Sequence, residues 1–152
     1  MSTPEQRLEQ MGLAVPEVAK PVASYIPAVR SGNHVFTSGQ LPMRQGQLIT
    51  TGKVGGEVTA DEAVECARVC ALNALAAVRA ELGELSAIKR IVKVVVFVAS
   101  TPDFTGQPGV ANGASELFGE VFGDIGQHAR SAVGVPVLPL DAPVEVELIV
   151  EV

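Results

Sequence analysis

The feature that most constrains the fold is an apolar segment at positions 88–100, IKRIVKVVVFVAS. β-Branched residues dominate it, and beyond Lys93 apolar and polar positions hardly alternate. Such a segment predicts a strand that is buried on both faces of a sheet. Its uninterrupted apolar run, Val94–Ala99, is far shorter than the roughly 20 residues that a membrane-spanning helix needs. The rest of the chain must therefore supply layers that cover this strand.

Two further strands are predicted near the C-terminus, on either side of a turn at Pro139–Pro143. The first extends from about Arg130 to Leu138. The second follows the turn and alternates residue by residue, which indicates one core-facing and one outward-facing side. The core-facing set is Val144, Val146, Leu148, Val150 and Val152, and the opposite set is Glu145, Glu147, Ile149 and Glu151.

Helix signals are clear at both ends of the predicted helices. Thr59 and Glu62 have the spacing of a capping box, and Gly83 supplies a C-terminal stop. The predicted helices are a short one between Thr3 and Gly12, one from Thr59 to about Gly83, and one from about Gly109 to Phe122, ended by Gly123. A β-hairpin is predicted around Ser31-Gly32-Asn33, and a glycine-rich loop with a short strand-like run at Gln47–Thr50 follows it.

This order of elements predicts an α+β fold in which a mixed β-sheet has two helices packed on one face. We expect a single domain over residues 1–152, with an N-terminal helix and linker at 1–20. Hydrophobic residues make up 47% of the chain and charged residues only 18%, so polar surface is scarce. The helix-free face of the sheet would be apolar, and we expect several copies of the chain to associate through it.

Charge and composition exclude several classes of function. The net charge of −6 is opposite to that of a nucleic-acid-binding surface, and aromatic residues for base stacking amount to only 4%. The N-terminus is charged where a signal peptide is apolar, so we expect a cytoplasmic protein with no membrane contact. Cys66 and Cys70 have no histidine or further cysteine nearby, which favours two buried thiols over a metal site or a disulfide.

Arg130 and Glu145 are the candidate functional residues that the spacing itself suggests. Burying a guanidinium without a partner costs several kcal/mol, so Arg130 either lies on the surface or binds an anion. If the two C-terminal strands pair across their turn, Glu145 lies toward the same end of the sheet as Arg130. The carboxylate then forms a structural ion pair with the arginine or activates a water molecule. The spacing leaves both interpretations open.

Ser38 and Gly39 end the first hairpin and could offer a hydroxyl and a backbone N–H to a ligand. No G-x-S-x-G motif surrounds Ser38, which argues against a nucleophilic serine. His34 and His128 are far from Ser38 in sequence, and we interpret them as surface or hydrogen-bonded histidines.

Four segments of the chain, in this order, resemble the RidA/YjgF family, also labelled the L-PSP endoribonuclease family. They are FTSGQLP (Phe36–Pro42), VKVVVFVASTPDF (Val92–Phe104), ANGASELFGEVFG (Ala111–Gly123) and HARSAVGVPVLPLDAPVEVELI (His128–Ile149). The resemblance extends from about Tyr25 to the C-terminus, and the extra N-terminal helix is similar to that of a bacterial subgroup. It implies a chorismate-mutase-like fold and a homotrimer with ligand clefts between subunits.

The resemblance also implies an activity: hydrolysis of reactive enamines and imines such as 2-aminoacrylate to 2-keto acids and ammonia, without a cofactor. This is the reaction of a 2-iminobutanoate/2-iminopropanoate deaminase. The resemblance implies three catalytic residues: Glu145, which would position the attacking water, Tyr25, which would line the cleft, and Ser38 at the end of the first hairpin. It also implies three substrate-binding residues: Arg130, which would grip the substrate carboxylate, Gly39 through its N–H, and Asn112 ahead of the second helix.

Two departures from the family pattern keep a second function open. Ala132 stands where well-characterised deaminases often have cysteine, and the loop Thr101–Gly109 looks longer than usual. The alternative is a non-catalytic trimer that binds small carboxylate metabolites such as imino or keto acids. Ribonuclease activity is a third possibility, suggested only by the older family label, and the acidic net charge conflicts with it.

Overall fold

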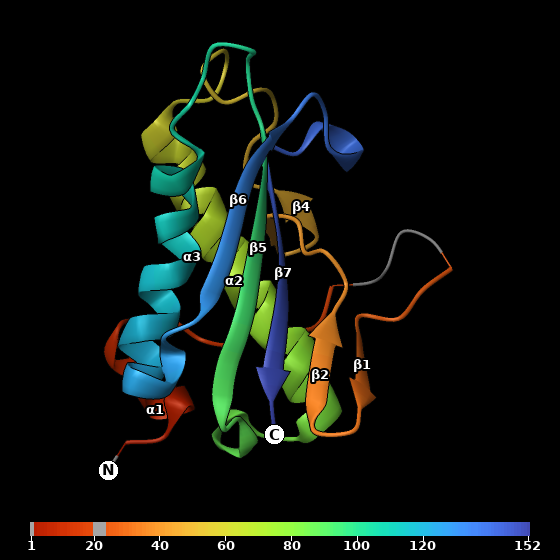
Figure 1. Ribbon diagram of the computed structural model, residues 1–152, viewed down its shortest axis with the longest axis vertical. Coiled ribbons are helices and arrows are strands. Elements are labelled where there is room, and N and C mark those ends of the chain that lie inside the picture. The colour runs from red at the N-terminus through yellow and green to blue at the C-terminus, as the bar shows by residue number, and fades with distance from the viewer. Residues whose placement is uncertain (1, 20–23) are drawn as a thin grey trace.

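The computed structural model describes residues 2–19 and 24–152, and these form a β-sheet backed by helices (Figure 1). The end of the predicted linker at residue 20 lies outside the described residues. Within them, the main sheet has the strand order β1-β2-β7-β5-β6. Its strands are β1 (Ala28–Ser31), β2 (His34–Thr37), β5 (Arg90–Ala99), β6 (Ala129–Val135) and β7 (Val144–Glu151).

Strand β5 lies between β6 and β7, and it pairs in parallel with β6 and antiparallel with β7. The two C-terminal strands are therefore not neighbours, and the idea that they pair across the Pro139–Pro143 turn was wrong. The physical reason is the helix between β5 and β6, because a strand–helix–strand unit returns the second strand parallel to the first. Strand β7 then pairs with the remaining edge of β5.

Helices α2 (Ala60–Leu82) and α3 (Gln107–Phe122) both cover one face of the sheet, as predicted (Figure 1). The hydroxyl of Thr59 accepts a hydrogen bond from the Glu62 backbone, and Gly83 ends α2 with a φ of 90°. Helix α3 begins at Gln107, slightly before the predicted start. The two helices approach closely at Gly113, where a Cβ atom would lie 2.1 Å from the carbonyl oxygen of Val64.

Helix α1 (Pro4–Gln10) packs against α3 and against the segment that follows α2. Thr3 and Gln6 form the capping box that starts it. Nη1 of Arg7 donates to the Val121 carbonyl at 3.1 Å, and a carboxylate oxygen of Glu5 accepts from the backbone N–H of Leu85 at 2.7 Å. The described residues also contain three short 3-10 helices: η1 (Leu85–Ala87), η2 (Gly123–Gly126) and η3 (Pro139–Asp141).

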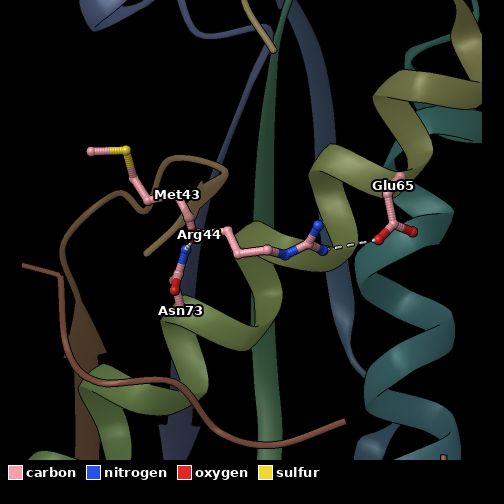
Figure 2. Close-up of polar contacts among 4 residues, drawn as sticks. All are labelled: Met43, Arg44, Glu65 and Asn73. Atoms are coloured by element: carbon pink, nitrogen blue, oxygen red, sulfur yellow. Dashed lines mark hydrogen bonds and ion pairs between the residues drawn. The ribbon is translucent and has the colours of Figure 1, made fainter. Parts of the chain in front are cut away.

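A two-stranded ribbon, β3 (Met43–Arg44) with β4 (Gln47–Leu48), holds the segment that follows β2 against α2. Asn73 of α2 is buried, and its side-chain amide donates to the carbonyls of Leu41 at 3.0 Å and Met43 at 2.9 Å. Figure 2 shows the contact of Asn73 with Met43 beside the ion pair of Arg44 with Glu65, in which Nη2 of Arg44 and Oε1 of Glu65 are 3.4 Å apart. The strand-like run after Gly46 was predicted, whereas its partner β3 was not.

The other face of the sheet is not covered by any described helix. Along β7 the valines and Leu148 are buried while the intervening glutamates are half-buried, which confirms the predicted alternation. On β5 the side chains of Val95 and Phe97 are also only half-buried, so the expectation that both faces of this strand are buried was wrong for the single chain. Apolar side chains of the neighbouring strands lie on the same open face: Val29, Phe36 and Val133 are 48%, 40% and 44% exposed.

Candidate ligand-binding site

Arg130 lies near the start of the edge strand β6 and its side chain reaches helix α3. Its partner across the sheet is Val94, which is buried under the helices. Nη1 of Arg130 donates to Oδ1 of Asn112 at 2.8 Å and to Oγ of Ser115 at 3.2 Å. Both acceptors lie one turn apart on α3 and so share one face of the helix. Asn112 thus lies within α3, whereas the family resemblance implied a position ahead of this helix.

A histidine extends this contact. Nε2 of His128 lies 2.8 Å from the hydroxyl of Ser115, and Nδ1 lies 2.6 Å from the carbonyl oxygen of Gly126. The imidazole also meets the ring of Phe118 edge-on, with 6.0 Å between centroids and 88° between planes. His128 is therefore a hydrogen-bonded histidine, as predicted, and it belongs to the surroundings of Arg130.

The rest of the Arg130 guanidinium has no protein acceptor among the described residues. Both recorded hydrogen bonds use Nη1, and neither Nε nor Nη2 donates to any of them. No described carboxylate forms an ion pair with Arg130. The ion pairs among the described residues are Arg44–Glu65 and Lys53–Asp141. A structural Arg130–Glu145 pair within one chain is therefore contradicted. The side edge of the guanidinium remains available to an anion.

Glu145 lies elsewhere, on the open face of the sheet. Its cross-strand partner is Phe97, and its carboxylate lies against the backbone of Gly39, where a Cβ atom would be 2.0 Å from Oε1. Burial raises the pKa of the Glu145 carboxyl above its ordinary value, and the negative charge of Glu147 raises it further. Glu145 is thus a carboxyl group suited to hold or transfer a proton.

Ser38 and Tyr25 lie at the end of β2 and just ahead of β1, respectively. The Ser38 hydroxyl donates to the carbonyl oxygen of Ile26, and its backbone N–H donates to that of Pro27 at 2.8 Å. These bonds hold the segment that carries Tyr25 beside the segment that carries Gly39. The Tyr25 side chain is 44% exposed. The structure thus brings Tyr25, Ser38, Gly39 and Glu145 to one region, on and beside the β1–β2–β7 part of the sheet.

The two groups of candidate residues do not meet within one chain. Strand β5 lies between the strands of Arg130 and Glu145, and their partners on it, Val94 and Phe97, are three residues apart. This offset corresponds to about 10 Å along the strand. Because the two partners point to opposite faces, so do Arg130 and Glu145. The expectation that both lie toward the same end of the sheet depended on the pairing of β6 with β7, which does not occur.

Ser115 and His128 are functional candidates that sequence reasoning missed. The available signals were the spacing of Asn112 and Ser115 on one helix face and the position of His128 two residues before Arg130. Neither spacing indicates a contact with Arg130 until the parallel pairing of β6 with β5 places that strand beside α3.

The described residues contain no group of three or more His, Cys, Asp or Glu side chains that could hold a metal ion. Cys66 and Cys70 are buried and free, as predicted. Burial raises the pKa of Cys66 to about 11 and that of Cys70 well above its ordinary value, which makes both thiols poor nucleophiles. No described helix is long and apolar enough to cross a membrane.

Curated relatives share most of the chain. Protein TCP17 of Trypanosoma cruzi is 46% identical over 95% of this chain and 91% of its own length. The 2-iminobutanoate/2-iminopropanoate deaminase of Dermatophagoides farinae is 33% identical over 91% of this chain and 93% of its own length.

Solved structures support the same relationship. Protein Atu1372 of Agrobacterium tumefaciens superposes with a TM-score of 0.92 at 46% identity, covering 98% of this chain and 92% of its own. Escherichia coli TdcF with bound serine superposes with a TM-score of 0.68 at 25% identity, covering 90% and 94%. The model of a family described as YjgF/chorismate mutase-like, which carries an endoribonuclease label, matches residues 5–152. The chain therefore belongs to the RidA/YjgF family and has its chorismate-mutase-like fold.

Proposed function

We propose that the chain hydrolyses reactive enamines and imines of the 2-aminoacrylate type to 2-keto acids and ammonia, with the substrate carboxylate held by Arg130. The observation that carries this proposal is the guanidinium itself, which is fixed through Nη1 and has no described carboxylate partner. Two relatives support it: one is named as an imine deaminase, and TdcF has serine, an amino acid with a carboxylate, bound in its structure.

The active unit that we propose is a homotrimer whose clefts lie between copies. In one chain, Arg130 and Glu145 are on opposite faces of the sheet, so a ligand can contact both only if they come from different copies. The open sheet face offers the surface for that contact, because Val29, Phe36 and Val133 are exposed on it. Burying such apolar groups favours association by about 25 cal/mol per Å² of area removed from water.

In the proposed mechanism, Arg130 of one copy fixes the carboxylate and thereby places C2 of the imine next to a water molecule. Glu145 of a second copy accepts a proton from that water as its oxygen bonds to C2, and the electron pair of the C=N bond moves to nitrogen, which takes a proton from solvent. The protonated Glu145 then gives its proton to the amino group of the carbinolamine, the C–N bond breaks to release ammonia, and the hydroxyl proton passes to solvent as the C=O bond forms. The raised pKa of Glu145 suits this two-way transfer. Asn112 holds Arg130, while Tyr25, Ser38 and the Gly39 N–H line the cleft.

This chemistry needs no cofactor in our proposal, since water is the only co-reactant and no electrons are transferred. Fixing the carboxylate and the water together removes much of the entropic barrier of a bimolecular step. The small side chain of Ala132, on the same side of β6 as Arg130, leaves the carboxylate clamp itself intact.

The second candidate is a trimer that binds small carboxylate metabolites without turnover. One observation favours it: the Ser38 hydroxyl already donates to the Ile26 carbonyl, which limits its use in catalysis. The endoribonuclease label has no comparable support, because the net charge of −6 opposes binding to RNA phosphates. We keep the cytoplasm as the proposed location.

The deciding experiment mixes the purified protein with freshly generated 2-aminoacrylate and follows pyruvate and ammonia. We expect release well above the spontaneous rate, and its loss in the Arg130→Ala variant. Binding of a 2-keto acid without any acceleration would favour the second candidate. Sedimentation should show a trimer, and a stable monomer of about the chain mass, 15.8 kDa, would remove the shared cleft.

A further inference from the structure

We propose that Ser115 and His128 are positioning residues that set the orientation of the Arg130 guanidinium, so that its Nε–Nη2 edge faces the ligand. The inference concerns the free protein, and it rests on the proposed function only for the statement that the ligand is a carboxylate. It begins from three consecutive contacts: Arg130 to Ser115, Ser115 to His128, and His128 to the Gly126 carbonyl.

The direction of these hydrogen bonds follows from the last contact. A carbonyl oxygen only accepts, so Nδ1 of His128 must carry a proton and donate to Gly126. In the neutral imidazole, Nε2 is then an acceptor, and the hydroxyl proton of Ser115 points to it. The Ser115 oxygen therefore turns its lone pairs to Nη1 of Arg130. A single tautomer of His128 thus satisfies every donor and acceptor in this series of hydrogen bonds.

The consequence for Arg130 is specific to one edge of the guanidinium. Nη1 carries two protons, and Asn112 and Ser115 accept one each. Asn112 alone would leave the group free to turn about that single bond, whereas two acceptors fix its plane. The remaining donors of the planar fork, Nε–H and the adjacent Nη2–H, can then bind a carboxylate in two parallel hydrogen bonds.

His128, at the end of this series of hydrogen bonds, is itself held in place. Gly126 is buried, and a Cβ atom there would lie 2.4 Å from the Phe118 carbonyl oxygen, so its carbonyl sits in a tightly packed turn. Phe118 also contacts the imidazole edge-on. Because Phe118 is fully buried in the core, the ring that orients Ser115 is anchored to the body of the domain.

Two pairs of variants test the inference. Ser115→Ala removes the acceptor for Nη1, and Ser115→Thr retains a hydroxyl. His128→Asn keeps a donor for Gly126 but has no acceptor at the position of Nε2, whereas His128→Gln offers an amide oxygen there. Glu120→Gln, on an exposed part of α3, is the control. Melting temperature and oligomeric state are measured for every variant.

The first readout is the affinity for 2-oxobutanoate and for its uncharged amide, by calorimetry. We expect Ser115→Ala and His128→Asn to bind the keto acid about 10-fold more weakly, as for a lost hydrogen bond to a charged group, with the amide little affected. The Thr and Gln variants should recover most of the loss. Equal weakening for keto acid and amide would identify a purely structural role and overturn the inference.

The second readout needs no ligand. In protein with ¹⁵N-labelled arginine, the Nη signals of Arg130, assigned with Arg130→Lys, should show slow rotation in the wild type and faster rotation in Ser115→Ala and His128→Asn. Unchanged rotation in both variants would overturn the inference. If the wild type binds no keto acid, the proposed function fails, and this second readout still decides whether Ser115 and His128 orient Arg130.

Discussion

The carboxylate of Glu145 lies directly over the backbone of Gly39, so closely that a Cβ atom at that position would be 2.0 Å from Oε1. Glycine at position 39 is therefore required by the carboxylate and not by the backbone, whose φ lies outside the left-handed region. This contact links the end of β2 to β7 and places the backbone of Gly39 next to the carboxyl group that we propose for proton transfer.

We predict that Gly39→Ala folds but loses activity. The clashing atoms all belong to the end of a flexible side chain, so Glu145 can rotate away, and alanine itself restricts the unfolded chain. Stability should change by less than about 1 kcal/mol. Displacement of the carboxylate should lower kcat/KM for imine hydrolysis by up to about 100-fold, which steady-state kinetics would measure.

A double-mutant cycle controls for other effects of the methyl group. In a Glu145→Ala background, Gly39→Ala should cause little further loss, because the displaced group is already absent. Additive losses would show that Gly39 acts on the ligand directly and that its contact with Glu145 is incidental.

Glu145 also predicts a pH dependence of stability. Its carboxyl has an ordinary pKa of 4.5, and burial followed by repulsion from Glu147 raises the pKa in the folded chain. Between these two pKa values the folded state binds more protons than the unfolded state, so this group lowers the free energy of unfolding as the pH rises through the window. Glu145→Gln should therefore stabilise the protein at pH 7 and make little difference below pH 4.5. Urea unfolding at both pH values checks this, and a Gln variant that is less stable at pH 7 would contradict it.

Much of the fold could be predicted because its signals are local. Thr59 and Gly83 mark the ends of α2 through a cap and a left-handed glycine, and the alternation along β7 shows directly which residues face the core. The pairing of β6 could not be read this way. The strand is joined to β7 by a short turn, which favours a hairpin, yet the helix between β5 and β6 decides its partner.

The same distinction applies to the site. Arg130 and Glu145 were predicted as a possible pair from their spacing and the supposed hairpin, and the structure places them on opposite faces of the sheet. The contact of Arg130 with Ser115 depends on which helix lies beside β6, which no local pattern encodes. Burial of both faces of β5 was also predicted wrongly for the single chain. An apolar strand sequence indicates that both faces are buried, but it does not indicate whether the residues that bury them belong to the same copy of the chain or to another.

The contact of α2 with α3 leads to a prediction about stability. In Gly113→Ala the new methyl group would lie 2.1 Å from the Val64 carbonyl oxygen, and this backbone atom cannot rotate away. The helices would have to separate, at a cost of about 1–3 kcal/mol or more. Gly119→Ala is the matched control on the same helix, since its methyl group would meet nothing within 4 Å. It should stabilise the protein by about 0.5–1 kcal/mol. Chemical denaturation of both variants measures the difference, and equal effects would show that the helices do not pack as described.

Arg130 gives the sharpest prediction about function. Truncating one partner of a desolvated charge pair typically costs about 2–5 kcal/mol, so Arg130→Ala should reduce 2-keto acid affinity or imine turnover by roughly 30-fold to several-thousand-fold. Arg130→Lys should recover only part of this loss, because an ammonium group keeps the charge but lacks the planar pair of donors. Calorimetry and steady-state kinetics measure both variants.

The control for this prediction is Arg90→Ala, which removes another strand-end arginine whose Nη2 donates only to the Gln127 carbonyl at 3.1 Å. Its affinity and turnover should match those of the wild type. Among the described residues, the Arg130 guanidinium donates hydrogen bonds only to side chains of α3, and Arg130 lies outside the hydrophobic core, so the oligomeric state and melting temperature should be unchanged in Arg130→Ala. If instead the assembly dissociates while the remaining folded protein binds keto acid normally, Arg130 serves the contact between copies and another group must hold the carboxylate.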